Sequence, residues 1–351
     1  MTETFIKIIH GVLVLSFVAL SSTCCNGPSD SGGNKINPYI KEIKFSDPKL
    51  SPNFLMAVWR GNAIFAIQGL SKFTIDNQYN VVKDTLLETD IKWENWTYID
   101  ANEAGTKLLL IEYKYDSFYD IPTTTLYEYD FQSNRLQPLY DKKSNISTAR
   151  YYPHDDTKIV YYSFGDSLSN GAGYYLRDKI TQQDTLLFPY LSSAGIWETL
   201  HGFDIHPSGG LLLVPINRSS GRFTHEKSPK IGIASLKKQT LDTLDVNFDF
   251  ILNRTGLYLR YNHDGSKILY CCFPDNAYGY VTNGTSEVGI IDATTLTKTI
   301  LDVDTYGKGL GSIQLAPNWS PDETAIVYGS GEVRLDGTAG IRHLYILTKL
   351  N

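Results

Sequence analysis

The feature that most constrains the fold of this chain is a short turn-and-strand pattern that recurs along it. The clearest copy spans residues 319–328 and opens with Trp319, Ser320, Pro321 and Asp322. Pro and Asp favour a tight turn, and the β-branched and aromatic residues that follow favour a buried strand. A chain built on such a repeat is expected to fold as similar stacked units.

Five weaker copies precede this one, each with a polar turn before an apolar run: residues 50–59, 102–111, 153–162, 205–214 and 262–270. Aligned on the turn, the equivalent positions are Phe54, Gly105, Asp156, Gly209, Gly265 and Glu323. Successive equivalents lie 51 to 58 residues apart. Propeller blades repeat at about 40–50 residues, with several strands in each blade.

Two further strands repeat at the same period. An apolar or aromatic strand follows each turn at residues 126–129, 174–176, 231–233, 288–291 and 343–347. A third strand, which begins Asp-Thr-Leu, recurs at residues 84–87, 184–187 and 242–244. Each unit is therefore predicted to be a small antiparallel sheet.

The sixth unit ends one strand short, at Asn351. Residues 39–45 alternate apolar and charged side chains and precede the first copy. We predict that this segment supplies the missing outer strand and closes the ring, which removes exposed sheet edges. The sequence thus predicts an all-β, six-bladed β-propeller over residues 37–351, and the spacing leaves no room for a seventh blade.

The run from Trp319 to Tyr328 resembles the blade signature of the TolB-like six-bladed β-propeller family, a WD40-like repeat. Glu323 stands where that signature usually has Gly, and the fifth copy keeps Asp264 and Gly265. The resemblance implies a periplasmic or secreted propeller that binds proteins or ligands. Its motif is structural and carries no catalytic residues across.

The first 23 residues read as a targeting segment. The apolar run 8–20 follows Lys7 and spans 13 residues, whereas a membrane-spanning helix needs about 20. Small residues and then Cys24 follow, which resembles a bacterial lipoprotein signal, with Cys24 or its neighbour Cys25 as the lipidated residue. A plain cleaved signal and an uncleaved anchor remain the alternatives.

Residues 24–36 are rich in Gly, Ser and Asn, a composition typical of a flexible tether. We therefore expect a lipid-anchored protein of the bacterial cell envelope, facing either the periplasm or the cell surface. The net charge of −6, without a long basic run, argues against a nucleic-acid partner. The adjacent Cys271 and Cys272 are predicted to point to opposite faces of a strand and to pack as small buried side chains.

Candidate binding residues lie in the segments that join one blade to the next, at the expected mouth of the central channel. Trp, Tyr and Arg are common in binding hot spots, and aromatic faces also suit sugar rings. The candidates are Trp93, Trp96, Arg150, Trp197, Glu198, His201, Arg254 and Tyr258. Packing between blades remains the alternative role for the tryptophans.

Three histidines, His154, His206 and His263, occupy the turns of three consecutive copies. Such turns share one face of a propeller, but they sit a blade apart, which is far for one metal ion with bonds of about 2 Å. We predict that they are polar turn residues and that the protein carries no metal and no cofactor.

The sequence contains no G-x-S-x-G, H-E-x-x-H or phosphate-binding loop. We predict a non-catalytic module that binds an envelope protein or a glycan, as a monomer or within a larger complex. The alternative is a metal-dependent lyase or hydrolase of carbohydrates, with Glu198 and His201 as metal ligand or base. A purely structural envelope protein is a third interpretation.

Overall fold

The computed structural model describes fourteen segments of the chain, and all of them belong to one compact unit, Asn37–Asn351. The described residues are 38–43, 56–67, 70–87, 96–114, 123–140, 146–163, 171–189, 196–197, 202–218, 230–246, 255–274, 283–307, 310–334 and 339–350. The predicted signal segment, residues 1–23, and the predicted tether, residues 24–36, lie outside them. Within them, no helix is long and apolar enough to span a bilayer.

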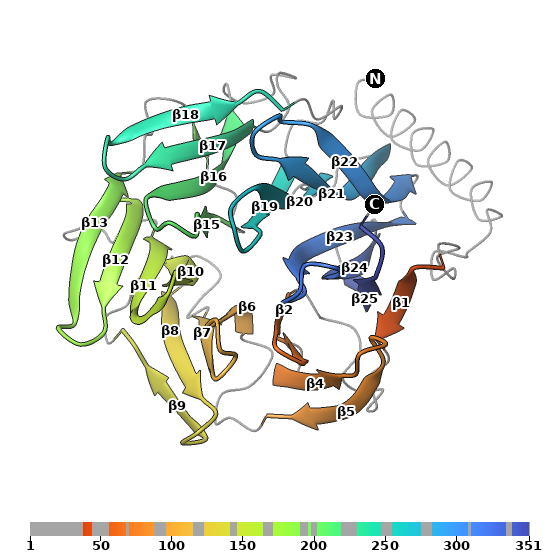
Figure 1. The fold of residues 1–351 in the computed structure, drawn as a ribbon, viewed down its shortest axis with the longest axis horizontal. Helices are drawn as coiled ribbons and strands as arrows, with labels where there is room; N and C mark the ends of the chain where they lie inside the picture. The colour runs from red at the N-terminus through yellow and green to blue at the C-terminus, as the bar shows by residue number, and fades with distance from the viewer. Residues whose placement is uncertain are drawn as a thin grey trace, which may run out of the picture. The chain divides into compact units, whose positions relative to one another are not determined.

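The strands form six antiparallel sheets arranged in a ring, as expected for a six-bladed β-propeller (Figure 1). Four strand levels run outward from the channel in each blade. The fifth and sixth blades are joined at their edge by a single residue pair, Gly307 with Leu310. The predicted fold class is confirmed.

The strands are most easily followed by their level in the blades. The innermost strands are β2 (Ala57–Arg60), β6 (Trp96–Ala101), β10 (Ile146–Tyr152), β15 (Asp204–Ile205) with β14 (Ile196–Trp197), β19 (Thr255–Tyr261) and β23 (Leu310–Trp319). The second strands are β3 (Ala63–Ala66), β7 (Lys107–Lys114), β11 (Asp155–Ser163), β16 (Leu211–Arg218), β20 (Lys267–Pro274) and β24 (Ile326–Arg334).

Two levels complete the blades. The third strands are β4 (Ser71–Ile75), β8 (Thr123–Asp130), β12 (Gly173–Asp178), β17 (Lys230–Ser235), β21 (Asn283–Asp292) and β25 (Ala339–Leu347). The outermost strands are β5 (Val81–Leu86), β9 (Arg135–Pro138), β13 (Gln183–Pro189), β18 (Thr240–Leu244), β22 (Lys298–Gly307) and β1 (Ile40–Ile43). The two further repeats seen in the sequence correspond to these third and outermost strands.

The second strands explain why the repeat reads as a continuous apolar run. Alternate side chains of a strand point to opposite faces, and both faces of a blade are covered by neighbouring blades. Ile326 and Tyr328 pack into one buried cluster, whereas Val327 packs into another. The two cysteines of β20 follow the same rule: Cys271 and Cys272 are both buried and belong to different clusters.

The ring is closed by the predicted N-terminal strand. β1 pairs antiparallel with β25, with Ile40 opposite Leu347 and Ile43 opposite Leu344. Ile43 is 3% exposed and packs in a cluster that also contains Trp59 of the first blade. The strand therefore completes the last blade and helps to hold the two ends of the ring together.

The turns between the innermost and second strands each contain one residue with a left-handed backbone: Gly61, Gly105, His154, Gly209, Gly265 and Glu323. This corrects two of the aligned positions. The first turn lies at Gly61, between β2 and β3, and the aligned Phe54 lies outside the described residues. In the third blade the left-handed residue is His154, not Asp156, because β10 and β11 are joined by a two-residue turn.

Candidate functional site

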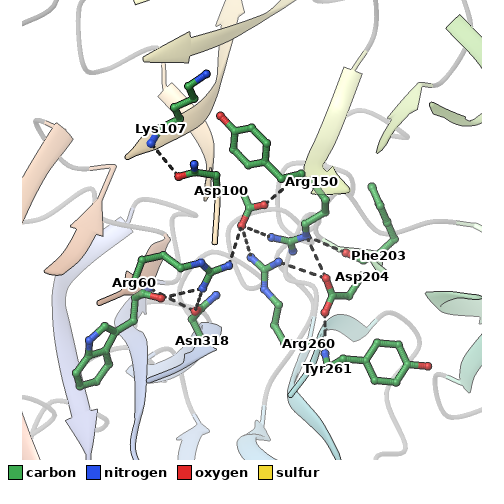
Figure 2. Close-up of polar contacts among 12 residues, drawn as sticks. Arg60, Asp100, Lys107, Arg150, Phe203, Asp204, Arg260, Tyr261 and Asn318 are labelled. Atoms are coloured by element: carbon green, nitrogen blue, oxygen red, sulfur yellow. Dashed lines mark hydrogen bonds and ion pairs between the residues drawn. The ribbon is translucent and has the colours of Figure 1, made fainter. Parts of the chain in front are cut away.

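The innermost strands place one polar side chain each at the same level of the central channel. These six residues, which we call the channel ring, are Arg60, Asp100, Arg150, Asp204, Arg260 and Asn318, in blade order. In four blades the ring residue stands five positions before the left-handed turn residue, and the short turns of the first and third blades reduce this offset. The side chains converge on one another (Figure 2).

Asp100 and Arg150 form the tightest part of the channel ring. Arg150 donates from Nη1 to Asp100 Oδ1 at 3.1 Å and from Nε to the carbonyl of Phe203 at 3.2 Å. Its Nε also lies 3.7 Å from Asp204 Oδ1, and its guanidinium lies 5.3 Å from the centre of the Tyr98 ring. Both side chains are nearly fully buried, each 4% exposed. Such a pair depends on its partners, because an uncompensated charge in this position is costly.

The remaining arginines are held less closely. Arg260 lies 3.8 Å from Asp100 and 3.7 Å from Asp204. Arg60 lies 4.0 Å from Asp100, and its side chain is 28% exposed. Asn318 Oδ1 accepts hydrogen bonds from the Trp59 amide at 3.3 Å and from Arg60 Nη1 at 3.4 Å. Arg60 Nη1 also donates to the backbone carbonyl of Trp59 at 2.8 Å.

Two ring residues have shifted pKa values. Burial raises the pKa of Asp204 to about 6, although Arg150 and the Tyr261 amide, which donates to Asp204 Oδ2 at 2.7 Å, act against the rise. Burial alone would lower the pKa of Arg150, but Tyr98, Asp100 and Asp204 outweigh it and raise that pKa. Arg150 therefore stays charged, while Asp204 becomes neutral in mildly acidic solution.

An apolar layer lies on one side of the ring. In four blades the residue two positions before the ring residue is buried and belongs to one apolar cluster. These residues are Val58, Tyr98, Tyr258 and Ala316. The Tyr98 hydroxyl has no hydrogen-bond partner among the described residues, and burial raises its pKa well above the usual value. We call these four residues the channel plug.

A cavity of about 350 Å³ opens on the other side of the ring, toward the face of the inner turns. All six ring residues line it, together with Trp59, Tyr261 and Trp319. Its volume lies at the lower end of the range of about 300–1,000 Å³ that ligand pockets occupy. The ring residues thus line a pocket that opens toward the inner turns.

Residues of the inner turns, together with one residue at the start of β11, surround the open end. This collar consists of Glu103, His154, Asp156, His263 and Glu323. Glu103 lies 3.1 Å from His154 Nδ1, and Glu323 accepts hydrogen bonds from Asn262 Nδ2 at 3.1 Å and from the His263 amide. Asp156 accepts from Asn102 Nδ2 at 2.7 Å. Each acid therefore ties its turn to that of a neighbouring blade.

The three turn histidines do not come together as one group. The rings of His154 and His263 meet edge to face, with centres 6.3 Å apart. They therefore lie closer together than expected for turns of different blades. His206 instead packs against Tyr261, with ring centres 4.9 Å apart. Within the described segments, no group of three or more His, Cys, Asp and Glu side chains is arranged to hold a metal ion.

Four of the eight candidate residues from the sequence can be located. Arg150 and Tyr258 lie within the innermost strands β10 and β19, not in loops, and both are buried. Arg150 belongs to the channel ring and Tyr258 to the channel plug. Trp96 and Trp197 lie at the start of β6 and at the end of β14.

The other four candidates, Trp93, Glu198, His201 and Arg254, lie outside the described residues. The proposed metal ligand or base of the enzymatic alternative is among them, so that interpretation stays a prediction.

Most of the channel ring was missed from the sequence. A signal was available: in four of the copies the residue five before the turn residue is charged or an amide, namely Asp100, Asp204, Arg260 and Asn318. It falls on strands that are otherwise mainly apolar, where a charged or amide side chain indicates a channel-facing or buried polar position.

Solved structures of other proteins share the fold. The "putative TolB" of Agrobacterium tumefaciens matches with a TM-score of 0.53 and 12% identity, over 84% of this chain and 89% of that one. An oligogalacturonate lyase in complex with manganese matches with a TM-score of 0.48 and 15% identity, over 82% and 74%. The β-propeller domain of the Trilobed protease from Pyrococcus furiosus has a TM-score of 0.43 and 12% identity, over 85% and 98%.

At 12% identity the likeness to the first of these structures concerns the fold alone, and it agrees with the six-bladed propeller built from the strands. No protein-family model and no curated protein matches the chain. The function has to be argued from the site itself.

Proposed function

We propose that this protein is a non-catalytic binding module that holds part of an envelope protein or a glycan in its central channel. The observation that carries the proposal is the cavity of about 350 Å³, which is lined by three arginines and has a collar of polar side chains at its mouth. A buried floor of preorganised charges offers strong, directional contacts to a ligand group. Rigid strands carry those charges, so little entropy is lost when they bind.

The test is capture of partners from an envelope fraction by purified protein. The double variant His154→Ala/His263→Ala alters the collar without touching the channel ring. It is expected to lose a saturable partner while its melting temperature stays within about 2 °C of the wild-type value. Unchanged capture by this variant would contradict binding at the turn face.

The strand-entry end of the channel is tested separately, because the sequence places Trp93, Trp96, Trp197, Glu198, His201 and Arg254 there. The matched variant Trp197→Ala/His201→Ala/Arg254→Ala is expected to retain the partner if the cavity holds it. Loss of binding in this variant alone would move the site to the end that the sequence predicts.

We also propose that a lipid on Cys24 tethers the protein to a membrane of the bacterial cell envelope. The small residues before Cys24 and the Gly/Ser-rich segment after it support this proposal. Metabolic labelling with a fatty acid should mark the wild type and the variant Cys25→Ala but not Cys24→Ala. Label that persists in Cys24→Ala would exclude this residue as the site of lipidation.

A further inference from the structure

The channel ring alternates in charge around five of its six positions and then stops. In blade order it reads Arg60, Asp100, Arg150, Asp204, Arg260, and the sixth position, which closes the circle between two arginines, is the neutral Asn318. Three arginines face two aspartates, so one positive charge has no counter-charge within the ring. The position where a third carboxylate would complete the pattern is occupied by an amide.

The contact distances locate this imbalance at Asn318. Arg150, which has an aspartate on each side, makes a hydrogen bond of 3.1 Å to Asp100. Arg60 and Arg260, which flank Asn318, come no closer to a ring carboxylate than 4.0 Å and 3.7 Å. Neither distance is that of a hydrogen bond. The hydrogen bonds of Arg60 Nη1 go to neutral oxygens, those of Trp59 and Asn318. The two arginines beside the neutral position are therefore the two that retain capacity for an anion.

The same two arginines line the cavity on the turn side, and they are exposed to different degrees. The Arg60 side chain is 28% exposed and that of Arg260 is 10% exposed, against 4% for Arg150. An anion that enters the cavity would meet guanidinium groups that are already held in place and largely removed from water. Charge-assisted hydrogen bonds are strongest in such surroundings.

We infer that a ligand supplies the sixth charge of the ring, and that this charge is the C-terminal carboxylate of a polypeptide seated over Asn318 between Arg60 and Arg260. This assignment rests on the proposed binding function and names its ligand. A single carboxylate balances the single excess charge, and a chain end is slender enough for a cavity of about 350 Å³. Capture of a terminal carboxylate is a recurrent mode of peptide recognition.

The collar favours a peptide over an acidic polysaccharide. Glu103, Asp156 and Glu323 place three carboxylates around the entrance, and the Glu103 side chain is 57% exposed. A polyuronate would bring repeated negative charges past these acids, which like-charge repulsion disfavours. A peptide backbone is neutral, and its N–H groups can donate to the same carboxylates.

A single substitution in the channel ring can supply the missing carboxylate from the protein itself. Asn318→Asp would place a carboxylate of the protein's own beside Arg60, in a side chain of nearly the same shape. It is expected to raise the melting temperature by a few degrees, because it completes the ring. It is also expected to remove the binding of a ligand carboxylate.

The experiment uses peptides tethered by their N-termini to an array, with free C-termini and all residue types at the last two positions. A matched array carries the same peptides as C-terminal amides, and a third carries hexuronate and neutral oligosaccharides. The wild type should bind a subset of the free acids and none of the amides. Arg60→Gln should weaken that binding about 10- to 100-fold, the equivalent of one charge-assisted hydrogen bond.

Arg135→Gln, the same change at an exposed position of the outermost strand β9, should leave the binding unchanged. Asn318→Asp should abolish it, and Arg60→Gln still tests the inference if Asn318→Asp does not fold. Equal binding of acids and amides would overturn the inference but keep the binding function, as would binding of hexuronates alone. The absence of saturable binding on every array, together with no captured envelope partner, would overturn both.

Discussion

Arg150 provides the sharpest energetic test of the channel ring. It is the arginine that stands between both aspartates, and its side chain is 4% exposed. Arg150→Met keeps most of the length and apolar volume of the side chain but removes the charge. Asp100 would then lose its 3.1 Å hydrogen bond, Asp204 would lose its 3.7 Å contact, and the Phe203 carbonyl would lose its donor.

Removing one partner of a buried ion pair costs about 3–5 kcal/mol, because the other charge remains buried without compensation. Arg260 still lies 3.8 Å from Asp100 and 3.7 Å from Asp204, so the lower part of that range, about 3–4 kcal/mol, is expected. The measurement is the free energy of unfolding in urea at pH 7, followed by circular dichroism.

Two matched variants show whether the loss arises from the charges. Arg60→Met makes the same change at the equivalent position of the first blade, where the side chain is 28% exposed and 4.0 Å from the nearest ring carboxylate. It should cost no more than about 1 kcal/mol. Adding Asp100→Asn to Arg150→Met should recover at least about 1 kcal/mol, since it removes the uncompensated charge. A loss below about 1 kcal/mol for Arg150→Met, or equal losses for both arginines, would refute this reasoning.

Three further predictions concern pH, closure of the ring and the turns. The folded-state pKa of Asp204 is raised from 3.8 to about 6, so the folded state holds this proton more tightly than the unfolded state does. Stability should therefore fall by up to about 3 kcal/mol as pH rises from 4 to 6. In Asp204→Asn the urea midpoint should depend less on pH across this range, and an unchanged pH dependence would count against the shift. Ile43→Ala should lower the free energy of unfolding by about 2–4 kcal/mol, because Ile43 is 3% exposed in the closing strand. The control in urea unfolding is Ile40→Ala, at a partly exposed position of the same strand. An equal loss in the two variants would contradict the role given to β1. Gly265→Ala should cost about 1–3 kcal/mol of stability, because φ is +77° and a Cβ would lie 2.2 Å from His206 Nε2. The control is Gly210→Ala, where a Cβ would meet nothing nearer than 3.9 Å. Equal shifts of the melting temperature in the two variants would contradict strain at Gly265.

The architecture could be predicted from the sequence because its signals are local and repeated. Each blade contains its own tight turn and its own buried second strand. The turn residues therefore recur at a regular spacing, and so do apolar runs such as the one that contains Val327. The closing strand was predictable for a related reason: the sixth unit lacked an outer strand, and residues 39–45 had the alternation of a strand with one exposed face. The first turn was misplaced because Pro52 and Asn53 resemble a turn as strongly as Gly61 and Asn62 do.

The candidate site was harder to predict, since it arises from side chains that meet only when the ring closes. Asp100 and Arg260 are 160 positions apart in the sequence, and nothing local indicates that they face one another. The sequence predicts Arg150 in a loop at the channel mouth, yet it lies buried in strand β10. Its partners, and the neutral position at Asn318, become visible only when the six innermost strands are compared at one level.

A crystal structure of the protein with the tightest free-acid peptide from the array would test the central claim most directly. The account predicts that the peptide enters from the turn face and that its terminal carboxylate lies within hydrogen-bonding distance of Arg60 and Arg260, above Asn318. A peptide bound at the strand-entry end or on the outer edge of a blade, with the channel ring unoccupied, would contradict it.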